Sequence, residues 1–249
     1  MPVFTPYPAP DDRLSSLAAW WDTPDGTYLW GRENAWCEVN LSQCFGYHVA
    51  LLGMNPALLA SIGGLRIPHH FSLGPRAGDV RGQFDGLPLA AESVDLVVLH
   101  HVLEYALDPH QVLREVDRVL VPEGHVMLLT FNPWGPWGWR GFLNAGRTPP
   151  WYGRRLGRKR LHDWLGLLGY DIQAEGWTGH GCISRRGRDG HALFEQTGER
   201  FWPRLGLTHG LLARKRVSLV APIRHRWSLM PVLGVGGRAS AQNRLGRNT

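Results

Sequence analysis

The middle of the chain constrains the fold more than any other part. Residues 93–101 and 125–131 are short, nearly continuous apolar runs, which are typical of strands covered on both faces in a parallel sheet. Between them, apolar residues recur at helical spacing over residues 108–120, and Asp108 and Pro109 supply an N-cap and a first-turn proline. The pattern predicts a strand, a helix and a second strand joined by a right-handed crossover.

Weaker patterns on either side extend this unit into one α/β domain, which a length of 249 residues allows. We expect a helix over residues 27–41, after a turn at Pro24-Asp25-Gly26, and a buried strand over residues 46–53. A short helix from Pro56 should follow that strand. Another helix, a sixth strand and a seventh strand are expected between residues 161 and 221.

Four short motifs resemble those of one family. They are Leu87-Pro88-Leu89, Val94-Asp95, Arg118-Val119-Leu120 and Pro122-Glu123-Gly124. In this order and spacing they resemble the type-11 group of class I S-adenosylmethionine-dependent methyltransferases. Phe131-Asn132-Pro133 and the Ala213–Arg216 segment are similar to a proteobacterial branch of that family.

The resemblance implies a Rossmann-like α/β fold, with a mostly parallel seven-stranded sheet and helices on both faces. Residues 1–26 would then be an N-terminal arm, and residues 27–221 the methyltransferase-like domain. Within that domain, residues 134–160 would be an aromatic and basic insertion or cap. Residues 222–249 would be a basic tail without regular structure, and the implied cofactor is S-adenosylmethionine (SAM).

The glycine-rich motif of the family is degenerate in this chain. Its pattern is acid-x-Gly-x-Gly-x-Gly, in which the acid meets the ammonium group of the cofactor and the glycines let backbone N–H groups approach. The corresponding residues are Leu51, Gly53, Asn55 and Ala57. Leu51 cannot form an ion pair, and Pro56 has no N–H to offer. Gly53 and Asn55 remain as expected cofactor contacts.

The other acids that hold the cofactor in the family are also missing or displaced. The ribose acid falls at Ser72, and the nearest acid is Asp79. Gln83 replaces the adenine-facing acid and can still donate and accept hydrogen bonds, with Asp85 as a nearby substitute. Together with Leu87, Gln83 and Asp85 are expected to line the adenine end of the site.

His100 and His101 end a predicted strand, where ligands bind in open α/β sheets. Either of them, or Tyr105, is a candidate general base, and both histidines are candidate cofactor contacts. Packing in the core is the alternative interpretation. No spacing of histidines, cysteines or acids matches a metal site, so no metal is expected. Three cysteines are also too few for a disulfide framework.

Aromatic residues alternate with glycine, proline and arginine after the fifth predicted strand. Such a mixture suits stacking on bases combined with phosphate contacts, or else a loop whose tryptophans fill gaps against the sheet. The candidate substrate or partner contacts are Trp134, Trp137, Trp151, Tyr152, Arg154 and Arg155.

Charge is distributed unevenly along the chain. Residues 1–150 hold 15 acids and 9 basic residues, whereas residues 151–249 hold 6 acids and 18 basic residues. The second part therefore favours a nucleic acid or another polyanion as partner. A solvated basic tail is the alternative interpretation.

The sequence thus predicts a SAM-dependent methyltransferase that acts on an unidentified acceptor. The alternative is a catalytically silent methyltransferase-like module that binds or regulates, with its basic half contacting nucleic acid or a protein. We expect a cytoplasmic protein, because the chain opens with no signal peptide and no apolar run reaches the roughly 18 residues that a membrane span needs.

Overall fold

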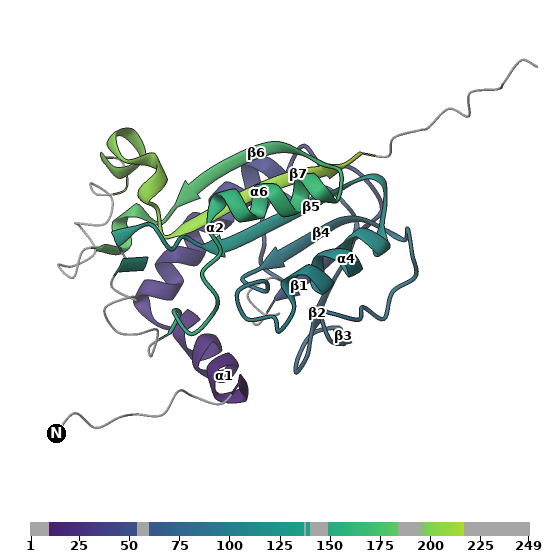
Figure 1. Cartoon of the computed structure of the whole chain (residues 1–249), viewed down its shortest axis with the longest axis horizontal. Helices are drawn as coiled ribbons and strands as arrows, with labels where there is room; N and C mark the ends of the chain where they lie inside the picture. Colours follow the sequence, from purple (N-terminus) through teal and green to yellow (C-terminus); the bar gives the residue numbers. More distant parts are fainter. Residues whose placement is uncertain are drawn as a thin grey trace, which may run out of the picture. The chain divides into compact units, whose positions relative to one another are not determined.

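One seven-stranded sheet organises the residues that the computed structural model describes, which are 10–53, 60–136, 138–139, 149–183, 195 and 197–216 (Figure 1). These residues fall within one compact unit, residues 1–217. The strands are β1 (His48–Gly53), β2 (His69–Gly74), β3 (Val80–Arg81), β4 (Val94–His100), β5 (Leu120–Phe131), β6 (Tyr170–Thr178) and β7 (Thr208–Lys215).

The strand order is β3-β2-β1-β4-β5-β7-β6. The strands from β1 to β5 pair in parallel, and β7 runs antiparallel to both β5 and β6. The predicted strand–helix–strand unit and the predicted sixth and seventh strands are confirmed. Because β7 alone is reversed, the sheet is mostly parallel, as the resemblance implied.

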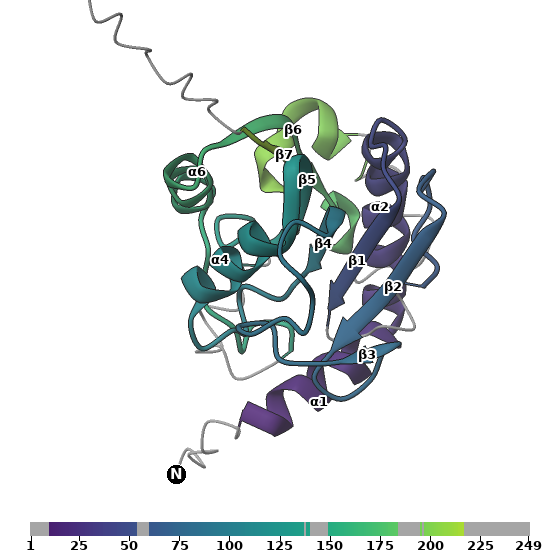
Figure 2. The ribbon, with the colours of Figure 1, turned by 90° about the vertical axis from the view of Figure 1, so that its right-hand side faces the viewer.

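Helices cover both faces of the sheet, as Figure 2 shows. On one face lie α4 (Pro109–Val119) and α6 (Arg158–Leu167), and on the other lies α2 (Pro24–Leu41). Each helix buries an apolar stripe, so the sheet separates two apolar layers. Two 3₁₀ turns, His180–Ile183 and Pro203–Leu205, lie in the chain between β6 and β7.

The amino-terminal region differs from the expected arm. Residues 10–21 form α1 (Pro10–Trp21), which lies beyond the carboxyl ends of the parallel strands in both ribbon views. Leu17 and Trp21 are buried in a cluster with Leu29, Phe131 and other apolar residues. The prediction of an arm is therefore wrong for these residues, because Leu17 and Trp21 pack against the apolar cluster that includes Leu29 and Phe131.

The turn predicted at Pro24-Asp25-Gly26 is also wrong. Thr23 is an N-cap whose side chain accepts a hydrogen bond from Gly26 N at 3.2 Å, and Pro24 occupies the first helical position. A Thr-Pro-Asp-Gly sequence suits a turn and a helix start equally well, because both need an extended residue followed by a fixed φ. The burial of the helix that follows decides between them.

Some expectations fall outside the described residues. They concern Asn55 and the short helix from Pro56, Trp137, and the tail of residues 222–249. Among the residues that are described, no helix combines the length and the apolarity that a membrane span requires.

Asp108 should contribute measurably to stability as the N-cap of α4. Its Oδ1 accepts hydrogen bonds from His110 N at 2.9 Å and Gln111 N at 3.1 Å. We expect Asp108→Ala to lower the free energy of unfolding by about 1 kcal/mol in a urea titration, since a lost N-cap costs about 0.5–2 kcal/mol. The control is Asp163→Ala, at an exposed position of α6, and equal losses in both variants would contradict the cap's role.

Candidate functional site

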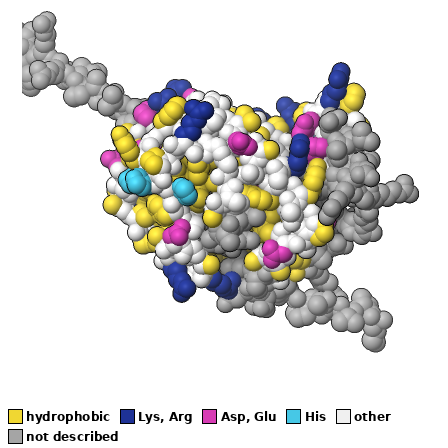
Figure 3. All heavy atoms as spheres, turned by 180° about the vertical axis from the view of Figure 1, so that it is seen from behind, with side chains coloured by type: hydrophobic (Ala, Val, Ile, Leu, Met, Phe, Trp, Pro, Cys, Tyr) yellow, Lys and Arg dark blue, Asp and Glu magenta, His cyan; other side chains and the backbone are white. Residues whose placement is uncertain are grey.

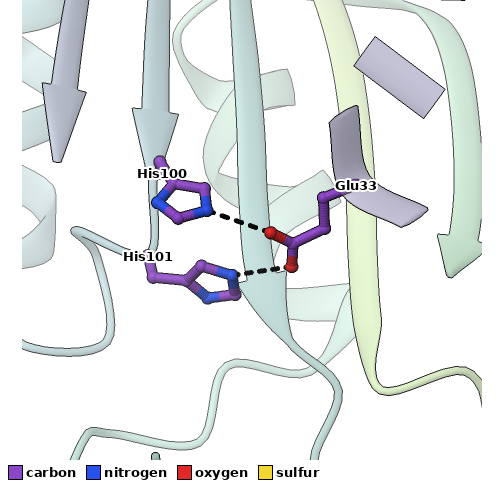
Figure 4. Close-up of side chains that lie close together, drawn as sticks. All are labelled: Glu33, His100 and His101. Atoms are coloured by element: carbon purple, nitrogen blue, oxygen red, sulfur yellow. Dashed lines mark hydrogen bonds and ion pairs between the residues drawn. The ribbon is translucent and has the colours of Figure 1, made fainter. Parts of the chain in front are cut away.

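A buried carboxylate meets two histidines at the carboxyl end of β4. Figure 4 shows Glu33 reaching from α2 to His100 and His101 at the end of β4. Its Oε2 lies 3.0 Å from His100 Nε2, and its Oε1 lies 3.0 Å from His101 Nε2. All three side chains are at most 1% exposed. The sequence prediction identified both histidines and missed the acid that joins them.

Two further side chains complete this network. Thr208, the first residue of β7, donates its hydroxyl to Glu33 Oε1 at 2.5 Å. Glu104 follows β4, and its Oε1 lies 3.1 Å from His101 Nδ1 and accepts a hydrogen bond from Phe131 N at 2.7 Å. Contacts between α2, β4, β5 and β7 therefore meet in one buried polar cluster.

The two histidines differ in protonation. Burial opposes the charge on His101, but Glu33 and Glu104 raise the pKa of His101 to about 9. Burial would also raise the pKa of Glu33, but the charge of His101 and hydrogen bonds from both histidines lower it to about 2. Burial lowers the pKa of His100 in spite of its bond to Glu33. Near neutral pH His101 is therefore an imidazolium, Glu33 is a carboxylate and His100 is a neutral imidazole.

The backbone of His101 is unusual for a bulky residue. Its φ of 52° lies in the left-handed region, where a side chain of this size is strained. The hydrogen bond from His101 N to the carbonyl oxygen of Leu129, at 2.9 Å, holds it there together with the two carboxylates. In this conformation the His101 ring lies between Glu33 and Glu104, just past the end of β4.

Trp21 of α1 covers the histidine pair. Its ring centroid lies 4.8 Å from that of His100 and 5.3 Å from that of His101. Phe131 stacks on the His101 ring, with ring centroids 3.8 Å apart. With no exposed ring nitrogen, neither histidine can take a proton from a bound acceptor in this arrangement. Their geometry suits a positioning role.

Glu33 could have been found from the sequence. Leu29, Glu33 and Cys37 recur every four residues on α2, and all three are buried. An acid on the apolar face of a helix predicts a buried partner, because an unpaired carboxylate there would be very costly. The partners could not be found this way, since they lie 67 and more residues away.

The structure explains why position 51 holds leucine. Leu51 is 1% exposed and packs in the apolar layer under α2, with Cys37 and Leu41 among its neighbours. An acid at this point would lie in that layer unless α2 moved. Gly53 ends β1 beside His100 of β4, so it does lie at the edge of the sheet where a cofactor would bind.

The displaced acid Asp79 is brought to Ser72 by a tight return of the chain. Its Oδ2 accepts hydrogen bonds from Ser72 N and from Ser72 Oγ, both at 2.8 Å. Ser72 lies two residues before the end of β2, and that end is Gly74. Asp79, which directly precedes β3, therefore joins β2 to β3 at Ser72, the residue at which the resemblance placed the ribose acid.

The segment that resembles the adenine side is fixed by α4. Leu87 N donates to Glu115 at 3.0 Å, and Arg118 donates to the carbonyl oxygen of Leu87 at 3.0 Å. Leu87 itself is 4% exposed, whereas Gln83 and Asp85 are exposed. Gln83 and Asp85 of the expected adenine end are thus accessible. Leu87 is buried, and its backbone is bonded to α4, so it supports the turn instead.

The aromatic candidates are divided by burial. Trp151 and Tyr152 are each 9% exposed, and Trp151 packs against Phe131 with ring centroids 5.8 Å apart. Trp134 is 68% exposed. Stacking of bases on Trp151 and Tyr152 is therefore the wrong prediction, since these rings fill the space between the sheet and the chain that follows it.

The polar candidates near them serve mainly the fold. Tyr105 donates its hydroxyl to the carbonyl oxygen of Pro150 at 2.5 Å, which does not suit a free general base. Asn132 donates to the carbonyl oxygens of Arg204 and Gly206, each at 2.9 Å. Arg154 is exposed but donates to the carbonyl oxygen of Leu107 at 2.8 Å, and Arg155 is exposed beside it.

Basic side chains do not gather on the face that Figure 3 shows. Among the described residues of that face, arginines and lysines lie in separate places around apolar side chains. Several arginines of the basic half also pair with acids, as Arg158 does with Glu175 at 2.7 Å and Arg216 with Asp171 at 2.6 Å. The net charge of residues 151–249 is therefore partly neutralised locally.

Comparisons with known proteins agree with this arrangement. Residues 63–128 match the type-11 family model described as a methyltransferase domain. The uncharacterized protein YafS of Escherichia coli strain K12 is 31% identical over 160 residues, which are 61% of this chain and 65% of YafS. The matched part thus spans less than two thirds of that relative.

Solved structures share the fold over most of the chain. A SAM-dependent methyltransferase of Thermotoga maritima has a TM-score of 0.60 at 14% identity, covering 83% of this chain and 98% of that one. The methyltransferase solved with the Haloferax volcanii activator Trm112 has a TM-score of 0.59 at 19% identity, covering 84% and 98%. The chain therefore has the class I methyltransferase fold.

Removing the central acid should damage the fold severely. In Glu33→Ala, the charged His101 would keep only Glu104 as a partner, and breaking a buried ion pair costs about 3–5 kcal/mol. We expect a loss of that order in the free energy of unfolding, measured by urea titration. Glu38→Ala, at an exposed position of the same helix, is the control and should change it by less than about 0.5 kcal/mol.

The histidine pair should also give stability an optimum with pH. His101 has a raised pKa when folded, so its contribution is complete below pH 6.5 and is lost as the pH rises towards 9. His100 has a lowered pKa when folded, so its contribution falls as the pH drops below 6.5. We expect His101→Gln to flatten the alkaline side of a plot of unfolding midpoint against pH, and His100→Gln the acid side. Unchanged profiles in both variants would contradict these protonation states.

Proposed function

We propose that the protein is a methyltransferase that binds SAM at the carboxyl ends of β1, β2 and β4 and transfers its methyl group to an acceptor. The observation that carries the proposal is the sheet order, with β7 reversed between β5 and β6. The match of residues 63–128 to a methyltransferase domain supports it independently.

The chain fits the two ends of SAM unequally. Gln83 and Asp85 are exposed and offer hydrogen-bonding groups for the nucleoside end. At the amino acid end, Leu51 is turned into the core and offers no charge. Gly53, which is buried, has no side chain to keep a ligand from the backbone at the end of β1. The proposed binding mode therefore relies on the nucleoside.

When bound, SAM supplies a methyl group on a positively charged sulfur. Transfer joins the methyl carbon to a lone pair of the acceptor as the carbon–sulfur bond breaks, so the proposed catalysis is chiefly alignment of two bound molecules. The Glu33–His101–Glu104 network serves that alignment by fixing the ends of β4 and β5. The histidines hold their protons inside the network and exchange none with the acceptor.

The second candidate is a silent methyltransferase-like module that binds a partner. Leu51 in the core and the covered histidines favour it, because both remove groups that an active site would use. Exposed Trp134 and the basic half of the chain would then form the interface. Direct measurement of SAM binding separates the two candidates.

We expect SAM to bind the purified protein with a dissociation constant of tens of micromolar or weaker. The absent acids would each contribute about 1.5–3 kcal/mol through charged hydrogen bonds. Isothermal titration calorimetry with SAM and with S-adenosylhomocysteine measures this directly. A submicromolar constant would contradict the expected weakness and show that other residues replace the acids. No heat and no thermal shift with either compound would favour the silent module.

Variants at the nucleoside end localise the binding. Gln83→Ala and Asp85→Ala should each weaken binding several-fold while leaving the unfolding midpoint unchanged, because both residues are exposed. Asp163→Ala on α6 is the matched surface control. If both nucleoside-end variants bind as the parent does, the cofactor lies elsewhere.

A further inference from the structure

Glu175 and two histidines form a second cluster of ionisable side chains, where α6 packs on β6 and β7. Glu175 lies on β6, His209 on β7 and His162 on α6. Glu175 Oε1 lies 2.9 Å from His162 Nε2 and 2.8 Å from His209 Nε2. The three residues are separated by 13 and 34 positions along the chain, so no short motif in the sequence displays them together.

Strand β7 separates this cluster from the one around Glu33. Thr208 and His209 are neighbours on β7, and successive side chains of a strand point to opposite faces. Thr208 bonds to Glu33 of α2, whereas His209 meets Glu175 and lies close to His162 of α6. β6 and β7 are also at the opposite edge of the sheet from β1, β2 and β3. The cluster is therefore separate from the proposed SAM site.

The backbone that carries the cluster is fixed by packing. Figure 1 shows α6 lying along β6 and β7, which pair antiparallel over their whole length. Leu161 and Leu165 of α6 are buried in the apolar layer that contains Leu211 of β7. Trp177 stacks on the ring of His209, with ring centroids 4.9 Å apart. The fold thus holds the carboxylate and both imidazoles in place, so a ligand would meet groups that are already positioned.

The groups of this cluster are of the kinds that zinc binds in proteins. Zinc takes imidazole nitrogens and carboxylate oxygens, and two histidines with one glutamate are a known ligand set. Burial would raise the pKa of Glu175, but hydrogen bonds from Arg158 and from both histidines lower it to about 2. Burial lowers the pKa of His209 in spite of its bond to Glu175. Near neutral pH Glu175 is therefore charged and His209 is neutral, as metal ligands must be.

A small movement would open the cluster to an ion. Two ligand atoms on one tetrahedral zinc ion lie about 3.3 Å apart, so each histidine nitrogen would move away from Glu175 Oε1 by about half an ångström. The three ligand atoms already lie within 4.8 Å of one another. The side chains of His162 and Arg158 are 27% and 49% exposed, so an ion can enter from solvent between them.

Arg158 is the cation with which an entering ion would compete. Its Nε lies 2.7 Å from Glu175 Oε1, and its Nη2 lies 2.9 Å from Glu175 Oε2. Glu175 Oε1 therefore has more nitrogen neighbours than it has lone pairs to satisfy them. It can exchange the contact with Arg158 Nε for an ion, while Arg158 Nη2 remains on Oε2.

We propose that His162, Glu175 and His209 bind a divalent ion of the zinc type, with solvent at the fourth position. Both histidines ligate through Nε2 and the glutamate through Oε1. The ion joins one helix to two strands, so its role is to hold α6 against the edge of the sheet. The proposal does not depend on methyl transfer.

Zinc chloride alone is the probe for this site. It is titrated by calorimetry into the full chain, after EDTA has removed bound metal and dialysis has removed the EDTA. We expect a micromolar or tighter dissociation constant and a higher unfolding midpoint with excess zinc, because a ligand of the folded state stabilises it. No heat of binding and no shift of the midpoint would overturn the proposal.

His162→Gln removes one ligand at a partly exposed position. The glutamine can still donate a hydrogen bond to Glu175, so the variant keeps that contact with the fold. We expect zinc to bind at least about tenfold more weakly. The control is His69→Gln, which changes an exposed histidine that stacks on His48 at the β1–β2 side of the sheet. Equal losses in the two variants would mean scattered binding to surface histidines and would contradict the site.

Arg158→Gln should act in the opposite direction. It removes the competing cation, so we expect zinc to bind several-fold more tightly, whereas Arg160→Gln, exposed on the same helix, should leave the affinity unchanged. A cluster that is only an ion pair would show no such gain. Unchanged or weaker zinc binding in Arg158→Gln would therefore refute the proposed ligand set. Since no methyl donor is present in any of these titrations, their outcome is independent of the proposed function.

Discussion

The Glu33 carboxylate is the interaction on which this arrangement depends. It belongs to α2 and is fully buried. It accepts hydrogen bonds from His100 and His101 at the end of β4 and from Thr208, the first residue of β7. An isolated charge at that depth would be very unfavourable, so α2 can dock only in the register that brings the acid to its partners. The charge thereby determines how the helix lies on the sheet and where β4 ends.

The fold could be predicted from the sequence largely because its signals are local. The apolar runs of β4 and β5, the spacing along α4 and the Asp108-Pro109 start all arise within a few residues. The amino-terminal helix was missed for the opposite reason. Trp21 is in place because of a histidine pair about 80 positions further along the chain, and no local pattern contains that information.

The candidate site was predicted less well, and the reasons are specific. His100 and His101 could be placed at the end of a strand, but only the fold shows that Trp21 covers them. In the family an acid occupies the position that corresponds to Leu51. The apolar packing under α2 explains why this chain has a leucine there. Arg154 and Trp151 were expected to act on a partner at the surface, yet burial separates the tryptophan from the arginine. Burial depends on distant chain segments, which a single sequence does not display.

The linkage through Glu33 also bears on how such chains can diverge. A substitution of the acid alone leaves two imidazoles without their common partner, and a substitution of either histidine leaves the acid short of a donor. Neutral drift one residue at a time is therefore obstructed at these positions. Related sequences should keep Glu33, His100, His101 and Thr208 as a set or exchange them as a set, for instance for an apolar quartet of similar volume.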